Sequence, residues 1–258
     1  MTRQTLELVS GKIVASASFG EVTYLTGDNK QIKPSTSAQL LAMWANLQAA
    51  GSMGIRGFGL HDQNRAFKVS VAAADVKVQT PQLPISLPVK GDVLIEAAGS
   101  ATTGDVNLVH VLNLYKGAST QNLFCGLGEL RSKFTGKILT QPNTLSLGTT
   151  GDYSGEESIV SEADNFDADF LYALVGYKVS ALCGAIGYRL KGGTRFGGPG
   201  DISSDRTKDF FVNLSRTFGD DLIPVLDPLD RQNFLIDGVQ DENGTDTTVE
   251  SIFAQLKR

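Results

Sequence analysis

LPISLPVKGDVLIEAAGSATTGDVNLVHVLNLY, residues 83–115, and IPVLDPLDRQNFLIDGVQDENGTDTTVESIFAQL, residues 223–256, follow one pattern. Each has a proline-bounded extended segment, a short strand, a polar loop and a last strand. Pro84 and Pro88 correspond to Pro224 and Pro228, 140 residues later. At the same offset lie Leu94 and Phe234, Ile95 and Leu235, Gly104 and Gly244, Val109 and Val249, and Leu112 and Ile252. The prolines and the loop glycine favour an internal duplication over chance similarity between two β-rich segments.

Apolar alternation along the rest of the chain predicts a mainly β protein. The 28 glycines agree, because tight turns between short strands use glycine. The expected strands are 6–17, 21–25, 67–71, 76–78, 93–96, 106–115, 170–175, 209–214, 222–226, 233–237 and 247–255, and residues 177–190 are expected to form a strand, a turn and a strand. One helix is expected over 38–50, with Ser35 or Ser37 as N-cap, Gly51 after its end and Trp44 in its buried face.

The two halves are expected to be separate domains. Residues 117–155 give little secondary-structure signal, and a boundary near Gly117 places one copy of the repeated ending at the end of each half. The predicted domains are residues 1–117 and 118–258, each of a common domain size. We expect each to be a β-sandwich.

Composition excludes several classes of protein. The net charge is −5 and no basic arm is present, which argues against charge-driven nucleic-acid binding. The first 22 residues lack the apolar core of a signal peptide, and no run of about 20 apolar residues predicts a membrane span. Cys125 and Cys183 form no disulfide framework and are expected to be small buried side chains in a reducing cytoplasm.

No set of residues predicts catalysis or a cofactor. His110 alternates with Val109 and Val111, so it is expected to face solvent or an interface. His61 and Asp62 lie in an expected loop without a nucleophile at a recognisable spacing. The glycine-rich segment 191–201 lacks the order of a phosphate-binding loop and is expected to be a surface loop. We therefore predict no catalytic, cofactor-binding or metal-binding residues and no cofactor.

Two acidic segments and two arginines leave alternatives open. Solvated loops are the expected state of the acidic segments, and a calcium ion at a subunit interface is the alternative. The acidic residues are Asp164, Asp167 and Asp169 in the first segment, and Asp237, Asp241 and Asp246 in the second. Arg195 and Arg206 are candidates for contacts with a neighbouring subunit, although nothing in the sequence separates them from ordinary surface residues.

The tandem layout over the whole chain resembles the double jelly-roll major capsid proteins of tailless icosahedral viruses of bacteria and archaea, many of which contain an internal membrane. The segments 83–115, 209–226 and 223–256 look like the last strands of such rolls. The resemblance implies two tandem eight-stranded jelly rolls with a few short helices. At 258 residues the chain would be short for that family, with little room for large tower loops.

The function implied by this resemblance is that of a non-enzymatic coat protein. It would assemble, as trimers with six similar lobes, into an icosahedral virion shell after synthesis in the host cytoplasm. Its partners would be copies of itself, penton and minor capsid proteins and, in many members, an internal membrane, with no sequence-specific nucleic-acid binding. The alternatives are a self-assembling shell protein of mixed α/β fold, which the expected helix over 38–50 favours, and a tandem β-sandwich binding module.

Overall fold

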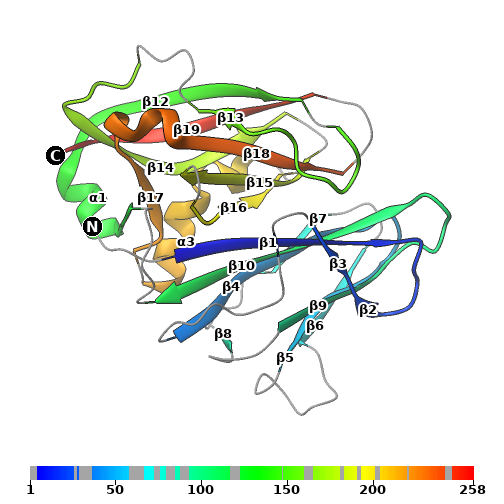
Figure 1. Ribbon diagram of the computed structural model, residues 1–258. Helices are drawn as coiled ribbons and strands as arrows, with labels where there is room; N and C mark the ends of the chain where they lie inside the picture. The colour runs from blue at the N-terminus through cyan, green and yellow to red at the C-terminus, as the bar shows by residue number, and fades with distance from the viewer. Residues whose placement is uncertain are drawn as a thin grey trace.

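The computed structural model describes residues 5–25, 28, 37–57, 67–72, 76–79, 85–87, 93–116, 123–146, 148–159, 165–180, 183–190, 193–200, 204–219, 221–241 and 246–258. Within these residues the chain forms four antiparallel sheets, two built from β1–β10 and two from β11–β19. Figure 1 shows the two groups as two bodies in contact, the first coloured from blue to teal and the second from green to red. The predicted mainly β fold class is confirmed.

The first body is a sandwich of two sheets. One sheet has the order β3-β1-β10-β4-β7, with β8 also on β4, and the other has the order β2-β9-β5-β6. The strands are β1 (Thr5–Val14), β2 (Gly20–Glu21), β3 (Thr23–Tyr24), β4 (Ser37–Asn46), β5 (Gly51–Gly57), β6 (Phe67–Val71), β7 (Val76–Gln79), β8 (Ile85–Leu87), β9 (Val93–Ala98) and β10 (Val106–Lys116).

The second body has sheets of order β11-β17-β14-β19-β12 and β13-β18-β15-β16. Its strands are β11 (Leu123–Cys125), β12 (Phe134–Leu145), β13 (Glu157–Ser158), β14 (Phe170–Val179), β15 (Cys183–Leu190), β16 (Phe196–Pro199), β17 (Ile223–Leu226), β18 (Phe234–Gln240) and β19 (Thr247–Lys257). Its helices are α1 (Leu127–Lys133), α2 (Ser204–Thr207), α3 (Phe210–Phe218) and the 3₁₀ helix η1 (Pro228–Asn233).

Both bodies have the strand order of a jelly roll. In each, the first long strand lies beside the last, the last beside the third, and the third beside the sixth, while the remaining four strands form the facing sheet. The strands of the two bodies correspond in order. The strands β1, β2, β4, β5, β6, β9 and β10 correspond to β12, β13, β14, β15, β16, β18 and β19, and the β7–β8 pair corresponds to β17. We call these bodies the first and second rolls.

A shared irregularity supports the offset of 140 residues. In the first roll, β4 has one extra residue between Leu40 and Ala42, opposite Leu112 and Asn113 of β10. In the second roll, β14 has one extra residue between Leu174 and Gly176, opposite Ile252 and Phe253 of β19. The partners on β10 and β19 are 140 positions apart. A bulge at the same place in two equivalent ladders indicates a common design, because bulges are retained as specific features of a fold.

The expected helix over 38–50 is wrong, since these residues form β4 and the start of the following turn. β4 lies inside its sheet, between β10 and the β7–β8 edge, and the side chains from Leu40 to Leu47 are buried on both faces. A strand that is covered on both faces has a continuous run of apolar residues in its sequence. Periodicity alone does not distinguish such a run from a buried helix. Trp44 is buried, as expected, and Gly51 begins β5 instead of ending a helix.

The expected strand over 209–214 is also wrong. Asp209 precedes α3, and Phe210, Phe211 and Leu214 form its buried side. Gly219 ends the helix in the left-handed conformation at φ 68°, with its N–H donating to the Ser215 carbonyl at 2.9 Å. In residues 117–155, for which the sequence pattern predicts little secondary structure, the structure contains β11, α1 and the 12-residue strand β12.

Candidate functional site

The region with the most specific chemistry is the junction between the two rolls. Alternate residues of β10 have different surroundings: Val109 and Val111 lie in the core of the first sandwich, whereas Leu108 and Leu112 pack in a cluster with residues of the second roll. Leu8 and Trp44, from β1 and β4, belong to that second cluster. The larger sheet of the first roll is therefore covered on both faces, once by its own roll and once by the other.

Trp44 connects β4 to the second roll. Its indole Nε1 donates a hydrogen bond to the Gly184 carbonyl at 2.9 Å. Its ring stacks on the His110 imidazole with a centroid separation of 5.4 Å. A Cβ on Gly184 would lie 3.1 Å from His110 Nε2 and 3.2 Å from a methyl of Leu108. The two rolls approach closely here because residue 184 has no side chain.

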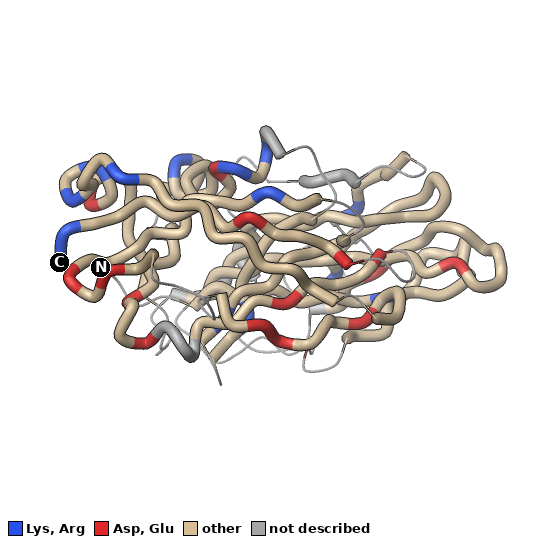
Figure 2. The backbone as a smooth tube through the Cα atoms, turned by 90° about the horizontal axis from the view of Figure 1, so that it is seen from above, with Lys and Arg blue, Asp and Glu red and all other residues tan. Residues whose placement is uncertain are grey.

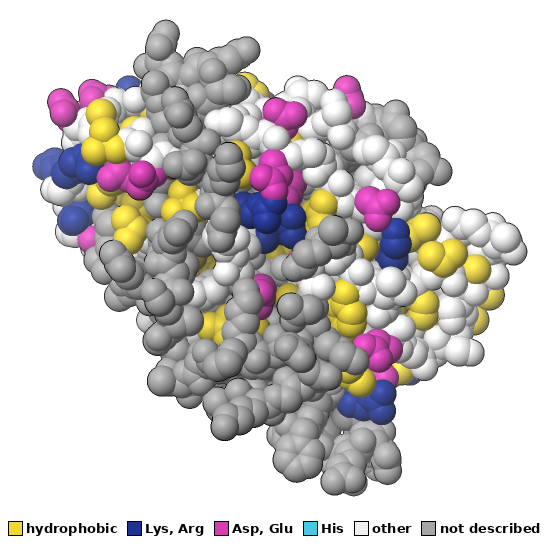
Figure 3. Space-filling model, viewed as in Figure 1, with side chains coloured by type: hydrophobic (Ala, Val, Ile, Leu, Met, Phe, Trp, Pro, Cys, Tyr) yellow, Lys and Arg dark blue, Asp and Glu magenta, His cyan; other side chains and the backbone are white. Residues whose placement is uncertain are grey.

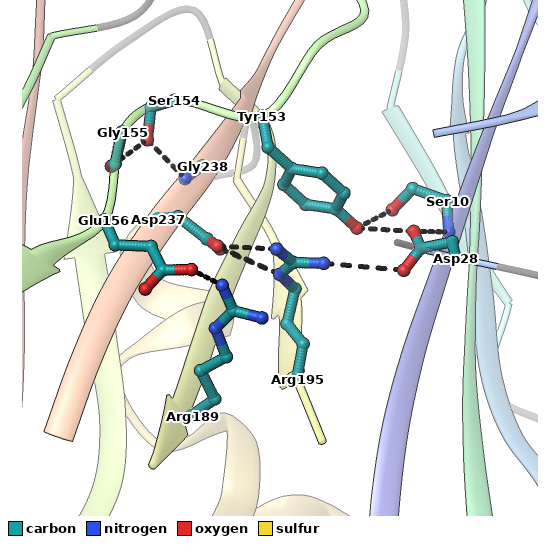
Figure 4. A network of polar contacts seen from close by, with 10 residues as sticks. All are labelled: Ser10, Asp28, Tyr153, Ser154, Gly155, Glu156, Arg189, Arg195, Asp237 and Gly238. Carbon is teal, nitrogen blue, oxygen red and sulfur yellow. Dashed lines mark hydrogen bonds and ion pairs between the residues drawn. The ribbon is translucent and has the colours of Figure 1, made fainter. Parts of the chain in front are cut away.

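Arg195, which precedes β16, is the charged centre of the junction (Figure 4). Its Nε and Nη2 donate to both carboxylate oxygens of Asp237 on β18, at 2.8 to 3.1 Å. Its Nη1 lies 3.4 Å from Oδ1 of Asp28, in the first roll. The guanidinium also stacks on the Tyr153 ring at 3.6 Å. One cation thus holds a carboxylate from each roll, with its flat face against an aromatic ring.

A chain of hydrogen bonds continues from Asp28 across the junction. Tyr153 of the second roll lies with its hydroxyl 2.8 Å from Asp28 Oδ2 and 2.9 Å from the Ser10 hydroxyl. The Ser10 hydroxyl lies 2.8 Å from His110 Nδ1, and the Ser10 backbone N–H donates to Asp28 Oδ2 at 2.8 Å. Figure 4 shows Tyr153, Ser10 and Asp28 meeting at this point. Four side chains from both rolls therefore form one continuous line.

Burial shifts the pKa values of these groups. It raises the pKa of Asp28 to about 6, against the lowering effects of the bonds from Tyr153 and Ser10 and of the Arg195 charge. It also raises the pKa of Asp237, again opposed by Arg195. Burial lowers the pKa of His110 to about 3, so its imidazole is neutral at physiological pH. Burial of the Tyr153 hydroxyl raises its pKa, which keeps the phenol protonated.

Ser10 and His110 have a spacing that suits a nucleophile and a base, but both are fully buried. A substrate has no access to a side chain with zero exposure, so this pair is part of the packing between rolls. Further contacts between the two rolls support this interpretation. Leu8 N–H donates to the Arg195 carbonyl at 2.8 Å, and Lys12 pairs with Asp152 at 2.9 Å.

The structure separates the residues of the acidic segments. Asp237 is paired with Arg195, and Asp241 is buried with Oδ2 accepting from Asn46 Nδ2 at 3.3 Å. These two are therefore not solvated loop residues, whereas Asp246 and Asp167 are exposed. Asp169 N–H donates to Asp167 Oδ1 at 2.9 Å, a turn contact. Within the described ranges no three His, Cys, Asp or Glu side chains gather as a metal site would require.

Other expectations have mixed outcomes. His110 does not face solvent, because its side chain points to the second roll. The sequence cannot show that both faces of its sheet are covered by other parts of the chain. Arg195 is buried within the chain, so it is not a surface contact, while Arg206 is exposed. In segment 191–201 the described residues 196–199 are buried in β16, so this part is not a surface loop. Cys125 and Cys183 are buried free thiols, as expected.

His61, Asp62 and Asp164 lie outside the described residues, as do Gly117, Pro84, Pro88 and Gly244. Sequence reasoning missed Asp28, Tyr153 and Ser10. Asp28 belongs to the turn-like sequence Thr26–Asn29, where an acidic residue is ordinary, and Tyr153 lies in a segment of weak signal. No local pattern marks a residue whose partners are more than 100 positions away.

The outer surface has a few exposed apolar side chains. Phe134 and Ile138 of the edge strand β12 are 38% and 53% exposed, and Leu229 of η1 is 73% exposed. Figure 3 shows apolar side chains on one face in small areas between charged and other polar ones. Figure 2 shows basic residues near the C-terminus. The last two residues, Lys257 and Arg258, follow Leu256, which pairs with Phe134 of β12. Among the described helices none is both long and apolar enough to cross a bilayer.

Comparison with known proteins gives weak structural matches. No family model matches the chain, and no curated protein matches it in sequence. It is similar to the PBSX exported protein XepA at 8% identity, over 96% of this chain and 86% of that one, with a TM-score of 0.30. It is similar to the major capsid protein P2 of bacteriophage PM2 at 8% identity, over 99% and 98%, with a TM-score of 0.27.

The STIV MCP is matched at 6% identity, over 99% of this chain and 97% of that one, with a TM-score of 0.24. Solved structures similar to this chain thus include major capsid proteins, the class that its sequence resembles. At TM-scores of this size the assignment of two jelly rolls depends on the strand order of the chain itself.

Proposed function

We propose that this protein is a structural coat protein whose two rolls act together as one building block of an icosahedral virion shell. The observation that carries the proposal is the tandem arrangement itself. Two rolls of one strand order, with a bulge at the same ladder position, occur in one chain. A trimer of such chains has six similar lobes, which suits a hexagonal lattice. The boundary that we propose between the rolls lies between residues 117 and 118.

The junction supports this role because a shell subunit must present its lobes in a fixed orientation. Arg195, Asp28 and Tyr153 join the rolls by charged and aromatic contacts, and Trp44 and Leu112 by apolar packing. Two domains joined by a large apolar interface with a buried ion pair do not reorient freely, unlike domains on an open linker. The two rolls therefore offer a single surface to neighbouring copies.

The start of β12 is the surface that we propose for contact between copies. Phe134 and Ile138 are exposed there on an edge strand, near Arg131, Lys137 and Lys133, the last of which is paired with Glu129 at 3.1 Å. Exposed apolar side chains on an edge are stabilised by burial against a neighbour. The chain is acidic as a whole, so a basic patch also complements other surfaces of the same protein. Penton and minor capsid proteins, and a membrane beneath the shell, are the further partners of this proposal.

The test is the size and shape of the purified full-length chain. We expect trimers or larger particles by light scattering coupled to size exclusion, and hollow shells or regular arrays by negative-stain electron microscopy. Ile138→Asp should reduce the particles to smaller species while far-ultraviolet circular dichroism stays unchanged, since the side chain is outside the core. Thr102→Asp, at an exposed loop position of the first roll, is the matched control and should assemble normally.

A chain that stays monomeric over a wide range of concentration and salt would contradict the proposal. In that case the tandem binding module becomes the better description, and glycan-array binding would examine it. If Ile138→Asp assembles like the parent, the shell role is retained and the β12 contact is rejected. The two parts of the proposal therefore fail separately.

A further inference from the structure

We propose that the junction is a proton-dependent switch in which Asp28 takes up one proton and the hydrogen-bonded chain Asp28–Tyr153–Ser10–His110 reverses direction. The reversal changes which nitrogen of the His110 imidazole carries the hydrogen. This inference goes beyond the proposed function, because it concerns the contact inside one chain and holds whether or not copies assemble.

Hydrogen counting fixes the direction of the chain in each state. The hydroxyls of Tyr153 and Ser10 each have one hydrogen, and each lies between two partners at 2.8 to 2.9 Å. When Asp28 is ionised it only accepts, so Tyr153 donates to Asp28, Ser10 donates to Tyr153, and His110 Nδ1–H donates to Ser10. His110 Nε2 then carries no hydrogen.

Protonation gives the opposite arrangement with all hydrogens accounted for. A proton that binds His110 Nε2 lets the Nδ1 hydrogen pass to Ser10, the Ser10 hydrogen to Tyr153, and the Tyr153 hydrogen to Asp28 Oδ2. Asp28 then donates to Tyr153, Tyr153 to Ser10, and Ser10 to His110 Nδ1. Three hydrogens become four, the fourth being the proton taken from solvent, and no other bond is broken or formed.

Burial favours this uptake, and of the groups around Asp28 only the Glu7 carboxylate adds to it, whereas Ser10, Tyr153 and Arg195 oppose it. From β1, Ser10 offers its backbone N–H and the Glu7 carboxylate adds repulsion. From the second roll come the neutral Tyr153 hydroxyl and the Arg195 guanidinium, with Asp237 behind it on β18. One buried cation thus faces two buried carboxylates, a net charge of −1 that a single proton removes. The pKa of Asp28, raised to about 6 by burial, agrees with this balance.

The other end of the chain has groups that respond to the change. His110 Nε2 and Asn46 Oδ1 lie 3.1 and 3.4 Å from the position that a Cβ of Gly184 would occupy, and neither atom has a hydrogen-bond partner among the described residues. With Asp28 ionised, both are acceptors facing one spot. With Asp28 protonated, Nε2 becomes a donor beside the Asn46 oxygen. The pKa of His110, lowered to about 3 by burial, means that the imidazole changes tautomer and stays neutral.

The test is the tautomer of His110, which ¹⁵N chemical shifts report directly. The chain has two histidines, so His61→Gln leaves His110 as the single labelled ring and identifies its signals in the parent. The full-length protein would be titrated from pH 8 to pH 4.5, in solution or as particles by solid-state measurement. We expect the Nδ1 and Nε2 shifts to exchange roles with a midpoint near pH 6, without the pattern of an imidazolium.

Two variants interrupt the chain at different places. Tyr153→Phe removes the central hydroxyl and Asp28→Asn removes the titrating group, so each should leave one His110 tautomer throughout the pH range. Tyr177→Phe is the matched control: its buried hydroxyl donates to the Pro199 carbonyl at 2.9 Å, outside the chain, and the midpoint should be retained. A parent His110 with one tautomer from pH 8 to 4.5, or a change that persists in Tyr153→Phe, would overturn the proposal. The parent measurement decides even if a variant does not fold.

Discussion

The two rolls share one strand order but are stabilised in different ways. The core of the first sandwich is mainly aliphatic, with Met43, Met53, Ile55 and Val109 among its members. The second roll is filled by aromatic side chains that contact one another, and α3 adds Phe210 and Phe211 to them. Tyr188 contacts four other rings, Tyr177, Phe196, Phe211 and Phe234.

Because of this difference, two rolls with the same topology need not be equally stable when separated. The larger sheet of the first roll buries Leu8, Trp44 and Leu112 against the second roll, so part of what stabilises it lies outside its own sandwich. Aromatic residues bury large areas and dominate the energy of a core. We therefore regard the second roll as the self-sufficient unit and the first as dependent on it.

The largest expected effect comes from separating the rolls at the proposed boundary. Residues 118–258 alone should give a cooperative thermal transition and dispersed amide signals. Residues 1–117 alone should aggregate or stay partly unfolded, because the face with Trp44 and Leu112 would be exposed to water. Size exclusion and proton–nitrogen spectra of the two fragments check this. A well-folded, soluble first fragment would show that the comparison is wrong.

A large single-residue effect is expected at Phe211, which is fully buried in the aromatic core of the second roll. Phe211→Ala should lower the free energy of unfolding by about 3–5 kcal/mol, through lost transfer energy and the cavity left behind. The control is Phe134→Ala, since Phe134 is 38% exposed and should cost less than about 1 kcal/mol. Urea denaturation gives both values. Similar losses at the two positions would contradict an aromatic core centred on α3.

The sequence predicts some elements of the two rolls correctly and others wrongly. The repeated ending was predictable because prolines and alternation are local signals, and β9, β10, β18 and β19 lie where the pattern places them. Residues 38–50 were misassigned because a strand buried on both faces has no two-residue alternation; Leu40, Leu41 and Trp44 are all buried. Helix α3 was misassigned because its short run Asp209–Leu214, rich in aromatic and branched residues, resembles a strand.

The junction could not be predicted at all. Arg195 was recognised as a possible contact residue, but its partners Asp28 and Asp237 are 167 and 42 positions away. A sequence shows that a charge exists, whereas its burial depends on how two sandwiches meet. For the same reason His110 was expected on an open or intersubunit face, although it lies against Gly184 of the same chain. Local chemistry predicts the rolls better than it predicts their contact.

A pH effect on stability sharpens the comparison at that contact. The pKa of Asp28 is about 6 in the folded protein and 3.8 in its ordinary state, so the folded chain binds more protons between these values. The stabilisation from Asp28 is therefore present below about pH 3.8 and is lost as the pH rises through about 6. Relative to Asp28→Asn, the parent should gain about 2 kcal/mol on going from pH 8 to pH 4. Urea midpoints of both proteins at each pH measure this gain, and a constant difference would contradict it.

The smallest expected effects compare two glycines of the second roll. A Cβ on Gly184 would lie 3.1 Å from His110 Nε2, 3.2 Å from Leu108 and 3.4 Å from Asn46 Oδ1, so Gly184→Ala must push the rolls apart or shift these side chains. Such overpacking costs about 1–3 kcal/mol. Gly128 in α1 has no atom within 4 Å of a built Cβ, and Gly128→Ala should stabilise by about 0.5 kcal/mol through the lower entropy of the unfolded chain.

The direction of the two changes matters more than their size. Thermal unfolding of the full chain should show a lower midpoint for Gly184→Ala and an equal or higher one for Gly128→Ala. The emission of Trp44, the single tryptophan, should also shift in Gly184→Ala, because its indole bonds to the carbonyl of residue 184. If Gly184→Ala were neutral in both measurements, the rolls would have room at this point. The first roll would then depend on the second through its apolar face alone, and the polar chain beside it would be free to rearrange without moving either sandwich.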